Sequence, residues 1–371
     1  MKIDIDCVVS KKDWEEFLKL PWSIYEGNPY WVPPLLQEVR ETLDIKKNPF
    51  WRHAKRELFL ARAEGKPVGR IVAVIDDNHN SFHNDKTGFF GFFECIDNAE
   101  VAQFLWDAAV SWLKKNGMGA MRGPLNPSMN DENSFLLEGF DKSPCVMMPY
   151  THAYYLDLAE HYGLKKAKDL YAFIKYAKDG IPPRIEKMIE RIKSRTGVKV
   201  RPFNMKKFDR DAQFLKDIYN AAWEKNWGFV PMTNEEMDAT GKKLKQFAEP
   251  SLVLFAEMDG EPIGVTVTVP DINQVLKKLN GRLGPIEVLK FLYYKRKITG
   301  VRSLVAGIKK EYRETGLIAV LYYETEKAGI RLGYKWCELG WNLEDNDLIN
   351  KFDAAVGGKI YKKYRIYEMK I

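Results

Sequence analysis

The strongest constraint on the fold is an internal repeat, because one half of the chain resembles the other. Residues 58–78 read LFLARAEGKPVGRIVAVIDDN, and residues 253–273 read VLFAEMDGEPIGVTVTVPDIN. Eight of the 21 aligned positions are identical without a gap. Each copy has an apolar strand, a tight turn that contains glycine, and a second alternating strand, which is typical of a β-hairpin. The sequence therefore predicts a duplicated domain.

Both halves also show the same order of elements around this hairpin. In the first half we expect a strand at 3–9, helices at 12–25 and 34–44, the hairpin, a strand at 89–94, a helix at 98–115, a strand at 120–123, a helix at 154–162 and a strand at 170–175. In the second half we expect a strand at 198–203, helices at 209–225 and 234–247, the hairpin at 252–269, helical pieces within 272–299, a strand at 303–308, a helix at 316–332, a strand at 335–343, a helix at 347–356 and a strand at 361–370. This order predicts an α/β (α+β) fold in which each domain has a mixed central sheet flanked by helices.

An amphipathic helix is expected between the halves. Pro183 marks a helix start, and Ile185, Ile189 and Ile192 recur at helical spacing. The predicted organisation is an N-terminal domain, a connecting helix and a C-terminal domain, at residues 1–179, 180–197 and 198–371.

Charge and composition exclude several classes of protein. The chain has 371 residues, with 58 Lys plus Arg against 51 Asp plus Glu, so its net charge is +7. We interpret this charge as mild and spread along the chain, so we expect no nucleic-acid partner. No run approaches the roughly 20 apolar residues of a membrane-spanning helix, so we expect no membrane partner. The N-terminus has no long apolar stretch, which argues against a secretory signal.

The four cysteines predict a reducing environment. Cys7, Cys95, Cys145 and Cys337 are scattered and form no CxxC pair. They are interpreted as small buried residues of a cytoplasmic protein, with no disulfide framework and no metal site.

One turn in the second half has the features of a phosphate site. Residues 303–319 read SLVAGIKKEYRETGLIA, an apolar strand followed by basic residues, Gly316 and a long helix. A glycine at a strand-to-helix turn lets backbone N–H groups converge, and the helix N-terminus adds partial positive charge. Lys309, Lys310 and Arg313 lie around the same turn. The alternative is an ordinary turn with solvated lysines.

The matching stretch of the first half lacks these features. Its strand runs into Glu94, Asp97 and Glu100, with no glycine or basic residue in the turn. Negative side chains repel a diphosphate. We therefore expect one cofactor per chain, in the C-terminal domain, and none in the N-terminal domain.

This turn resembles that of the GNAT superfamily of N-acyltransferases, in which an Arg/Gln-x-x-Gly-x-Gly/Ala turn binds the diphosphate of acyl-CoA. Arg313, Gly316 and Ile318 fall on the three motif positions, with Ile318 where the family has Gly or Ala. The order of elements extends the resemblance over nearly the whole chain, as two tandem GNAT-like domains. It implies acetyl-CoA or another acyl-CoA as co-substrate, with these residues at the cofactor: Ile308, Lys309, Arg313, Glu314, Thr315, Gly316, Leu317 and Ile318.

Candidate catalytic groups follow from the same resemblance, because GNAT enzymes use a glutamate on a central strand and a tyrosine acid. Glu338 lies in KWCELGW, where strand alternation puts it with Gly340 on one face and Cys337 on the other. That face borders either a cleft or solvent, and solvent is the commoner surrounding of a carboxylate. The position of the family's tyrosine holds Asp353. Possible substitutes are Tyr322 and Tyr323 on the preceding helix and Tyr361 or Tyr364 beyond it, and Tyr323 is our candidate acid.

Other residues carry weaker signals. His79 and His83 have the spacing of a helical metal pair, but DDNHNSFHND is rich in loop formers, so both are interpreted as surface residues. The apolar residues within 272–299 are expected either to line a channel for a longer acyl chain or to pack against the neighbouring domain.

The resemblance implies an acyl-CoA-dependent N-acyltransferase that moves an acetyl or longer acyl group to an amine of a small molecule or peptide. Two alternatives stay open: a Fem-type aminoacyl transferase, and a non-catalytic GNAT-like binding or regulatory module.

Overall fold

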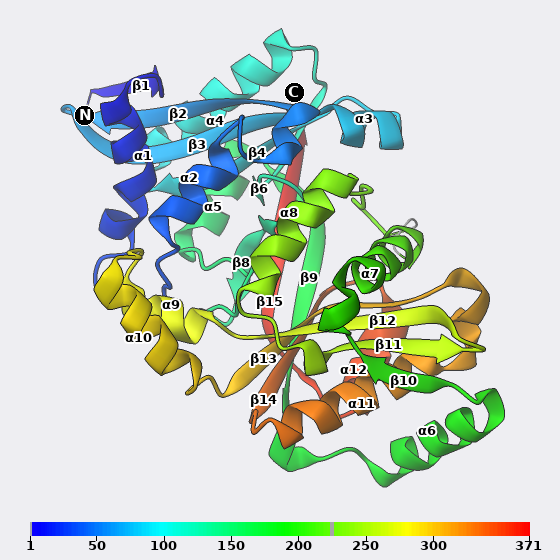
Figure 1. Cartoon of the computed structure of the whole chain (residues 1–371). Helices are drawn as coiled ribbons and strands as arrows, with labels where there is room; N and C mark the ends of the chain where they lie inside the picture. The colour runs from blue at the N-terminus through cyan, green and yellow to red at the C-terminus, as the bar shows by residue number, and fades with distance from the viewer. Residues whose placement is uncertain (1, 223–225) are drawn as a thin grey trace. The chain divides into compact units, whose positions relative to one another are not determined.

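The computed structural model describes residues 2–222 and 226–371 and forms two compact units (Figure 1). Unit 1 comprises Met1–Asp169, Val275–Leu292 and Lys363–Ile371, and unit 2 comprises Leu170–Gln274 and Tyr293–Lys362. The mixed α/β architecture expected from the sequence is confirmed. Of the helix expected at 209–225, the last three residues lie outside the described residues.

The elements follow the expected order. The first part of the chain contains β1 (Ile3–Cys7), α1 (Lys11–Ile24), α2 (Leu36–Leu43), β2 (Ala54–Ala63), β3 (Lys66–Asp76), α3 (Asp77–His83), β4 (Thr87–Cys95), α4 (Ala99–Lys115), β5 (Ala120–Gly123), β6 (Leu125–Asn126), β7 (Glu132–Asn133), β8 (Phe135–Glu138), α5 (Tyr154–Tyr162) and β9 (Lys165–Tyr176). The second part contains α6 (Pro183–Thr196), β10 (Lys199–Pro202), α7 (Phe208–Ala222), α8 (Asn234–Lys245), β11 (Val253–Met258), β12 (Glu261–Pro270), α9 (Asn273–Leu279), α10 (Pro285–Lys295), β13 (Gly300–Ile308), α11 (Leu317–Arg331), β14 (Trp336–Leu343), α12 (Asp347–Ala355) and β15 (Lys359–Lys370).

The two units have the same strand order. In unit 1 the order is β1-β2-β3-β4-β5-β15, and in unit 2 it is β10-β11-β12-β13-β14-β9. Neighbouring strands are antiparallel in both, except for one parallel pair at the same place, β4 with β5 and β13 with β14. The duplication read from the hairpins therefore extends to the whole sheet.

The sixth strand of each unit comes from the other half of the chain. In unit 2, residues 170–176 of β9 pair with β14. In unit 1, residues 367–370 of β15 pair with β5. Each terminal strand therefore leaves the half that encodes it and completes the sheet of the other unit.

The repeated hairpins match in backbone detail. Their turns place Glu64 and Gly65 at φ 50° and 78°, and Asp259 and Gly260 at φ 51° and 82°. Positive φ at both central residues is the conformation that suits the twist of a two-residue hairpin, and glycine adopts it without strain. The register shift after Ala61 recurs after Ala256, its partner in the repeat.

Each sheet is covered by the helix that follows the fourth strand. In unit 1, α4 buries Leu105 and Trp106 completely, and the indole of Trp106 stacks on Phe93 at 4.5 Å between ring centroids. In unit 2, α11 buries Leu317 and Leu321 completely. Among the described residues, no helix has the length and apolar composition required to span a bilayer.

Candidate functional site

The parallel pair of unit 2 opens before its strands end. The register between β13 and β14 runs from Gly300 with Trp336 to Ser303 with Leu339. Beyond it, β13 continues to Ile308 along its other neighbour, β12. The two parallel strands therefore part after Ser303.

The residues expected at the cofactor lie together around the turn that follows β13. Residues 310–315 form a short 3-10 helix, Gly316 has φ 79°, and α11 begins at Leu317. The backbone N–H of Lys309 donates to the carbonyl of Ile263 at 2.8 Å, which fixes the start of the turn. Arg313 and Glu314 are exposed, whereas Ile308 and Leu317 are buried.

Ile318, which departs from the family motif, is half-buried. Its side chain packs against the apolar core beneath α11.

The connecting helix α6 covers one side of this turn. A Cβ built on Gly316 lies 2.8 Å from Cδ1 of Ile192. The Arg195 guanidinium donates to the carbonyl of Thr315 at 3.3 Å, and Lys193 forms an ion pair with Glu324 of α11. The helix thus adds positive charge at the turn while it narrows the space around Gly316.

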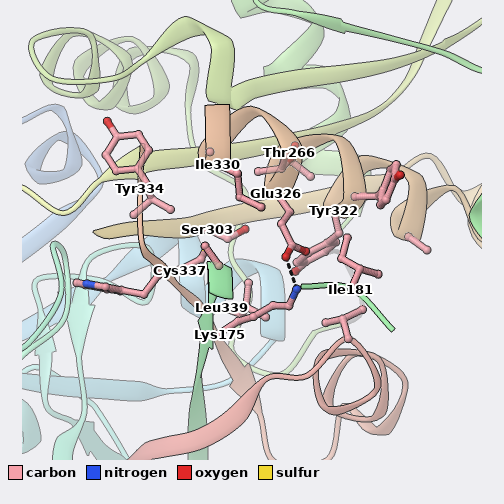
Figure 2. A pocket seen from close by; sticks show the side chains of 18 of the residues that line it. Lys175, Ile181, Thr266, Ser303, Tyr322, Glu326, Ile330, Tyr334, Cys337 and Leu339 are labelled. Atoms are coloured by element: carbon pink, nitrogen blue, oxygen red, sulfur yellow. Dashed lines mark hydrogen bonds and ion pairs between the residues drawn. The ribbon is translucent and has the colours of Figure 1, made fainter. Parts of the chain in front are cut away.

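A mainly apolar cavity lies beside α11 (Figure 2). The cavity has a volume of about 70 Å³, which is enough for several water molecules. Its walls come from the end of β9, the segment that leads into α6, the helices α6 and α11, and the strands β12, β13 and β14. They include Ile181, Ile185, Ile189, Ser303, Ala319, Tyr322, Tyr323, Ile330, Cys337 and Leu339.

One ion pair stands in this apolar wall. Figure 2 shows the amine of Lys175 directed at the carboxylate of Glu326, and the two side chains are 6% and 18% exposed. Lys175 also donates to the carbonyl of Gly180 at 3.1 Å. Ser303 and Leu339, the last paired residues of β13 and β14, line the same cavity.

Glu338 lies on the other face of the sheet, as strand alternation predicts, because its neighbours Cys337 and Leu339 line the cavity. It borders no solvent, since its side chain is fully buried. Its Oε1 is 3.0 Å from Nε of Arg302, and its Oε2 accepts a hydrogen bond from the Tyr361 hydroxyl. The expectation of a solvent-facing carboxylate is therefore wrong, because two remote side chains stabilise the buried charge.

Oε1 of Glu338 is ion-paired with Arg302 but accepts no hydrogen bond from the described residues. Within the described part of the chain, Oε1 has no hydrogen-bond donor in suitable geometry. Nε of Arg302 instead donates to the carbonyl of Gly340 at 3.3 Å. A buried carboxylate oxygen that lacks a hydrogen bond is unusual, and it can accept one from a ligand N–H.

Asp353 is a buried acid on α12. Burial raises its pKa to about 7, and the amide of Asn342, which donates to Oδ2 at 2.7 Å, partly opposes this shift. The carboxyl is therefore largely protonated below neutral pH. The sequence shows its position but gives no sign of this burial.

Tyr323 is half-buried at the cavity. Partial burial, followed by the charge of Glu186, raises the pKa of its hydroxyl. Ammonium groups of Lys193 and Lys327 lie 5.5 and 5.1 Å from its ring centroid. The hydroxyl therefore keeps its proton at neutral pH.

The corresponding place in unit 1 is filled by the chain itself. A Cβ on Gly91 of β4 would lie 1.7 Å from the carbonyl oxygen of Leu125. The backbone N–H of Phe92 donates to Oδ1 of Asn126 at 2.6 Å. In contrast to unit 2, β6 therefore lies directly against β4 just beyond the paired part of the parallel strands.

Glu94 turns inward from this region. Its side chain is 14% exposed, and its Oε2 accepts a hydrogen bond from Tyr155 at 2.7 Å, with Arg70 at 3.8 Å from Oε1. Burial raises the pKa of Glu94, and the Arg70 guanidinium partly opposes the shift. Sequence reasoning missed this network, because its members come from three distant segments.

The interpretation of His79 as a surface residue is wrong. It lies in α3 and is 2% exposed, and burial lowers its pKa to about 4. Its ring packs against His83 and Phe89. Within residues 2–222 and 226–371, no group of three His, Cys, Asp or Glu side chains is arranged to hold a metal ion.

Two curated proteins are similar over nearly the full chain. Protein YghO of Escherichia coli is 34% identical over 371 residues, covering 98% of this chain and 94% of that protein. A protein of Caulobacter vibrioides named bacterial ceramide synthase is 35% identical over 369 residues, covering 97% and 96%. No protein-family model matches the chain.

Solved structures with the same fold have low sequence identity. A tandem GNAT protein of the clavulanic acid biosynthesis pathway aligns with a TM-score of 0.59 at 13% identity, covering 100% of this chain and 98% of that one. A GCN5-related N-acetyltransferase of Sphaerobacter thermophilus aligns with a TM-score of 0.55 at 11% identity, covering 99% and 95%. The chain thus has the fold of a tandem GNAT protein, and it belongs to the family of YghO and bacterial ceramide synthase.

Proposed function

We propose that this protein transfers an acyl group from an acyl-CoA to the amine of a long-chain amino alcohol, and that unit 2 carries the reaction. A ceramide is the N-acyl derivative of such an amino alcohol, so the name of the Caulobacter relative supplies the substrate class. The observation in this chain that carries the proposal is the mainly apolar cavity beside α11. Its isoleucine-rich wall suits a short part of a hydrocarbon chain, since burying apolar surface drives such binding.

The residues of the 308–318 turn fit an acyl-CoA diphosphate in their chemistry. Gly316 presents backbone without a side chain, and α11 begins there without a side-chain cap. Lys309, Lys310 and Arg313 surround the turn, and Arg195 of α6 reaches the carbonyl of Thr315. When bound, acyl-CoA supplies the activated thioester. We propose that Ile308, Lys309, Arg313, Glu314, Thr315, Gly316, Leu317 and Ile318 form its binding turn.

The N-terminal domain is proposed to bind no cofactor. In unit 1 the backbone of Leu125 closes against Gly91, and Asn126 occupies the N–H of Phe92. Both features fill the region just beyond the paired part of β4 and β5. In unit 2, the corresponding strands β13 and β14 do not pair with each other in this region. One acyl-CoA per chain is the expected stoichiometry.

Glu338 is our proposed base. Its Oε1 is buried on the face of the sheet opposite the cavity, and within the described residues it lacks a hydrogen bond, so we propose that it takes the proton from an amine bound where β13 and β14 part after Ser303. Arg302 and Tyr361 hold the carboxylate in one orientation.

Tyr323 is our proposed acid, because its hydroxyl is protonated at neutral pH and lies at the cavity. Donation of this proton to the departing thiolate completes the transfer.

Turnover of the full-length protein tests the function. Purified protein is incubated with sphinganine and either acetyl-CoA or palmitoyl-CoA in detergent, and thiol release and N-acyl product are measured by absorbance and mass spectrometry. We expect product with the long-chain donor. If no N-acyl product forms and titration calorimetry detects no acyl-CoA binding, the proposal is refuted. Product from aminoacyl-tRNA would instead favour the Fem-type alternative.

Two variants locate the site. Gly316→Val places a side chain at φ 79° against Ile192, so acyl-CoA binding should be lost. Gly333→Val, at φ 88° in open space, is the matched control for backbone strain. Glu338→Gln should lower kcat by about 100-fold or more while acyl-CoA still binds, since general base catalysis contributes about 10²–10⁴-fold. Unchanged kcat would remove Glu338 from the mechanism.

A further inference from the structure

Most of the net charge of the protein is concentrated in one segment. Residues 272–299 contain seven Lys and Arg but one acidic residue, Glu287, so they carry 7 − 1 = +6 of the chain's +7. The expectation that the charge is spread along the chain is therefore wrong. This segment forms α9 and α10, the two consecutive helices drawn in yellow in Figure 1.

The first of these helices is firmly held in unit 1. Leu276 and Leu279 of α9 are buried. Nε1 of Trp22 donates to Asn280 at 3.0 Å, and a Cβ on Gly281 would lie 2.2 Å from the Trp22 ring. Lys277 donates to Ser143 at 2.9 Å. The start of α10 is thus fixed in position.

The second helix presents an apolar face outward. None of its residues is buried. Besides Pro285 and Lys290, its exposed side chains are large and apolar, with exposed fractions from 44% to 68%. With Leu283 just before the helix they form what we call the α10 face: Leu283, Ile286, Val288, Leu289, Leu292 and Tyr293.

The arrangement of this face is regular. At 100° per residue, the residues of the α10 face that lie in the helix cover a continuous arc of about 160° around its axis. Their order along the arc is Val288, Leu292, Leu289, Tyr293 and Ile286. Lys290 borders the arc at the Ile286 side. Phe291 and Tyr294, on the opposite side of the helix, are half-buried.

Leu289, Leu292 and Tyr293 of α10 line no cavity described above, and each is more than half exposed. An apolar arc with a basic border is typical of a helix that lies in a membrane interface.

We propose that the α10 face docks on the surface of an anionic lipid bilayer. The charge of the segment indicates this partner. Aliphatic side chains suit the apolar interior of a bilayer, and the net charge of +6 suits its negative headgroup surface. Eleven residues are too few to span a bilayer, so the helix lies in the plane of the surface. The expectation of no membrane partner rested on the absence of a spanning segment, and an interfacial helix needs none.

The purpose of this contact rests on the proposed function. Long-chain amino alcohols and their N-acyl products are poorly soluble in water and reside in membranes. A protein that docks on the bilayer meets its substrate there and returns its product to the same place.

Vesicle co-sedimentation of the full chain tests the docking without any substrate. We expect binding to vesicles of phosphatidylcholine with phosphatidylglycerol, weaker binding to phosphatidylcholine alone, and release in high salt because salt screens the basic residues. The Ile286→Asp, Leu289→Asp variant should bind at least tenfold more weakly, since burying one such side chain is worth about tenfold or more. Leu348→Asp replaces an apolar side chain that is 79% exposed on α12 and should bind as the parent does.

The outcomes separate docking from function. If the parent protein stays in the supernatant with anionic vesicles, or the double variant binds as well as the parent, the docking proposal is overturned. If light scattering shows that the parent is a dimer and the double variant a monomer, while neither binds vesicles, a second copy covers the face and the proposal is also overturned. Detergent-dispersed substrate should be turned over equally by both proteins. Vesicle binding without any turnover would instead count against the proposed function alone.

Discussion

Asparagine in place of Asp353 tests whether this carboxyl stays protonated in the folded protein. Burial raises its pKa from 3.8 to about 7. The difference is about 3 units, and at about 1.4 kcal/mol per unit its ionisation in the folded state costs about 4 kcal/mol. The unfolded chain loses this proton near pH 3.8 and the folded chain near pH 7, so between these values the folded state binds more protons. Stability therefore falls as pH rises through this window and is constant above it.

The Asp353→Asn variant keeps an oxygen that accepts from Asn342 but has no proton to lose. Urea unfolding of both proteins at about pH 5 and about pH 8 compares their free energies of unfolding. The free energy of unfolding of the variant relative to the parent should be about 3 kcal/mol higher at the higher pH. The parent alone loses stability over the roughly 2 pH units between about pH 5 and the folded-state pKa of Asp353. Asp347→Asn, which changes a carboxylate that is 76% exposed on the same helix, is the control. An advantage that is equal at both pH values would refute the reasoning.

Three further predictions concern local packing and charge. Because burial disfavours the imidazolium, the carbon-bound ring protons of His79 should shift in NMR with a titration midpoint near pH 4, and a midpoint near 6.5 would contradict this. The free energy of unfolding should therefore fall as the pH drops below 6.5, the pKa of the unfolded state. Lys175→Met should lower the free energy of unfolding in urea by about 3–5 kcal/mol, because it leaves Glu326 buried and unpaired. The double variant Lys175→Met, Glu326→Leu should regain most of this stability, and equal losses in the single and double variants would argue against a buried pair. Gly91→Ala should lower Tm well below that of Gly119→Ala, since its new Cβ meets the Leu125 carbonyl while the other meets nothing within 4 Å; equal Tm values would contradict the close approach.

The hairpins were predictable because their information is local. The glycines of both turns, Gly65 and Gly260, adopt the positive φ that the turn type demands, and the alternating strands follow directly. Alternation along β14 also placed Glu338 and Cys337 on opposite faces correctly. What alternation omits is the partner: Arg302 and Tyr361 come from other strands, and they make the difference between an exposed and a buried carboxylate.

The helix α3 shows why composition misled. Its Asn and Asp residues are typical of loops, yet two of them act as helix ends. The side chain of Asp76 accepts from the N–H of Asn78, which caps the start, and Asn84 ends the helix at φ 51°. Residues that favour turns also favour helix caps, and only the packing of His79 decides between the two.

The role of α6 was also beyond local reasoning. Its isoleucine stripe predicts a buried face, but a stripe does not identify the surface that it meets. In the structure Ile192 faces Gly316, while Ile185 and Ile189 line the cavity.

The exchanged terminal strands constrain how this protein can be dissected or evolve. A protease cut or a gene split within the linker before α6 yields an N-terminal fragment without the strand that borders β5, while β14 in the C-terminal fragment lacks its neighbour from β9. Each fragment then exposes unpaired backbone along a sheet edge, which favours aggregation. After duplication, the two copies were therefore free to diverge in their turns and cavities but not to separate.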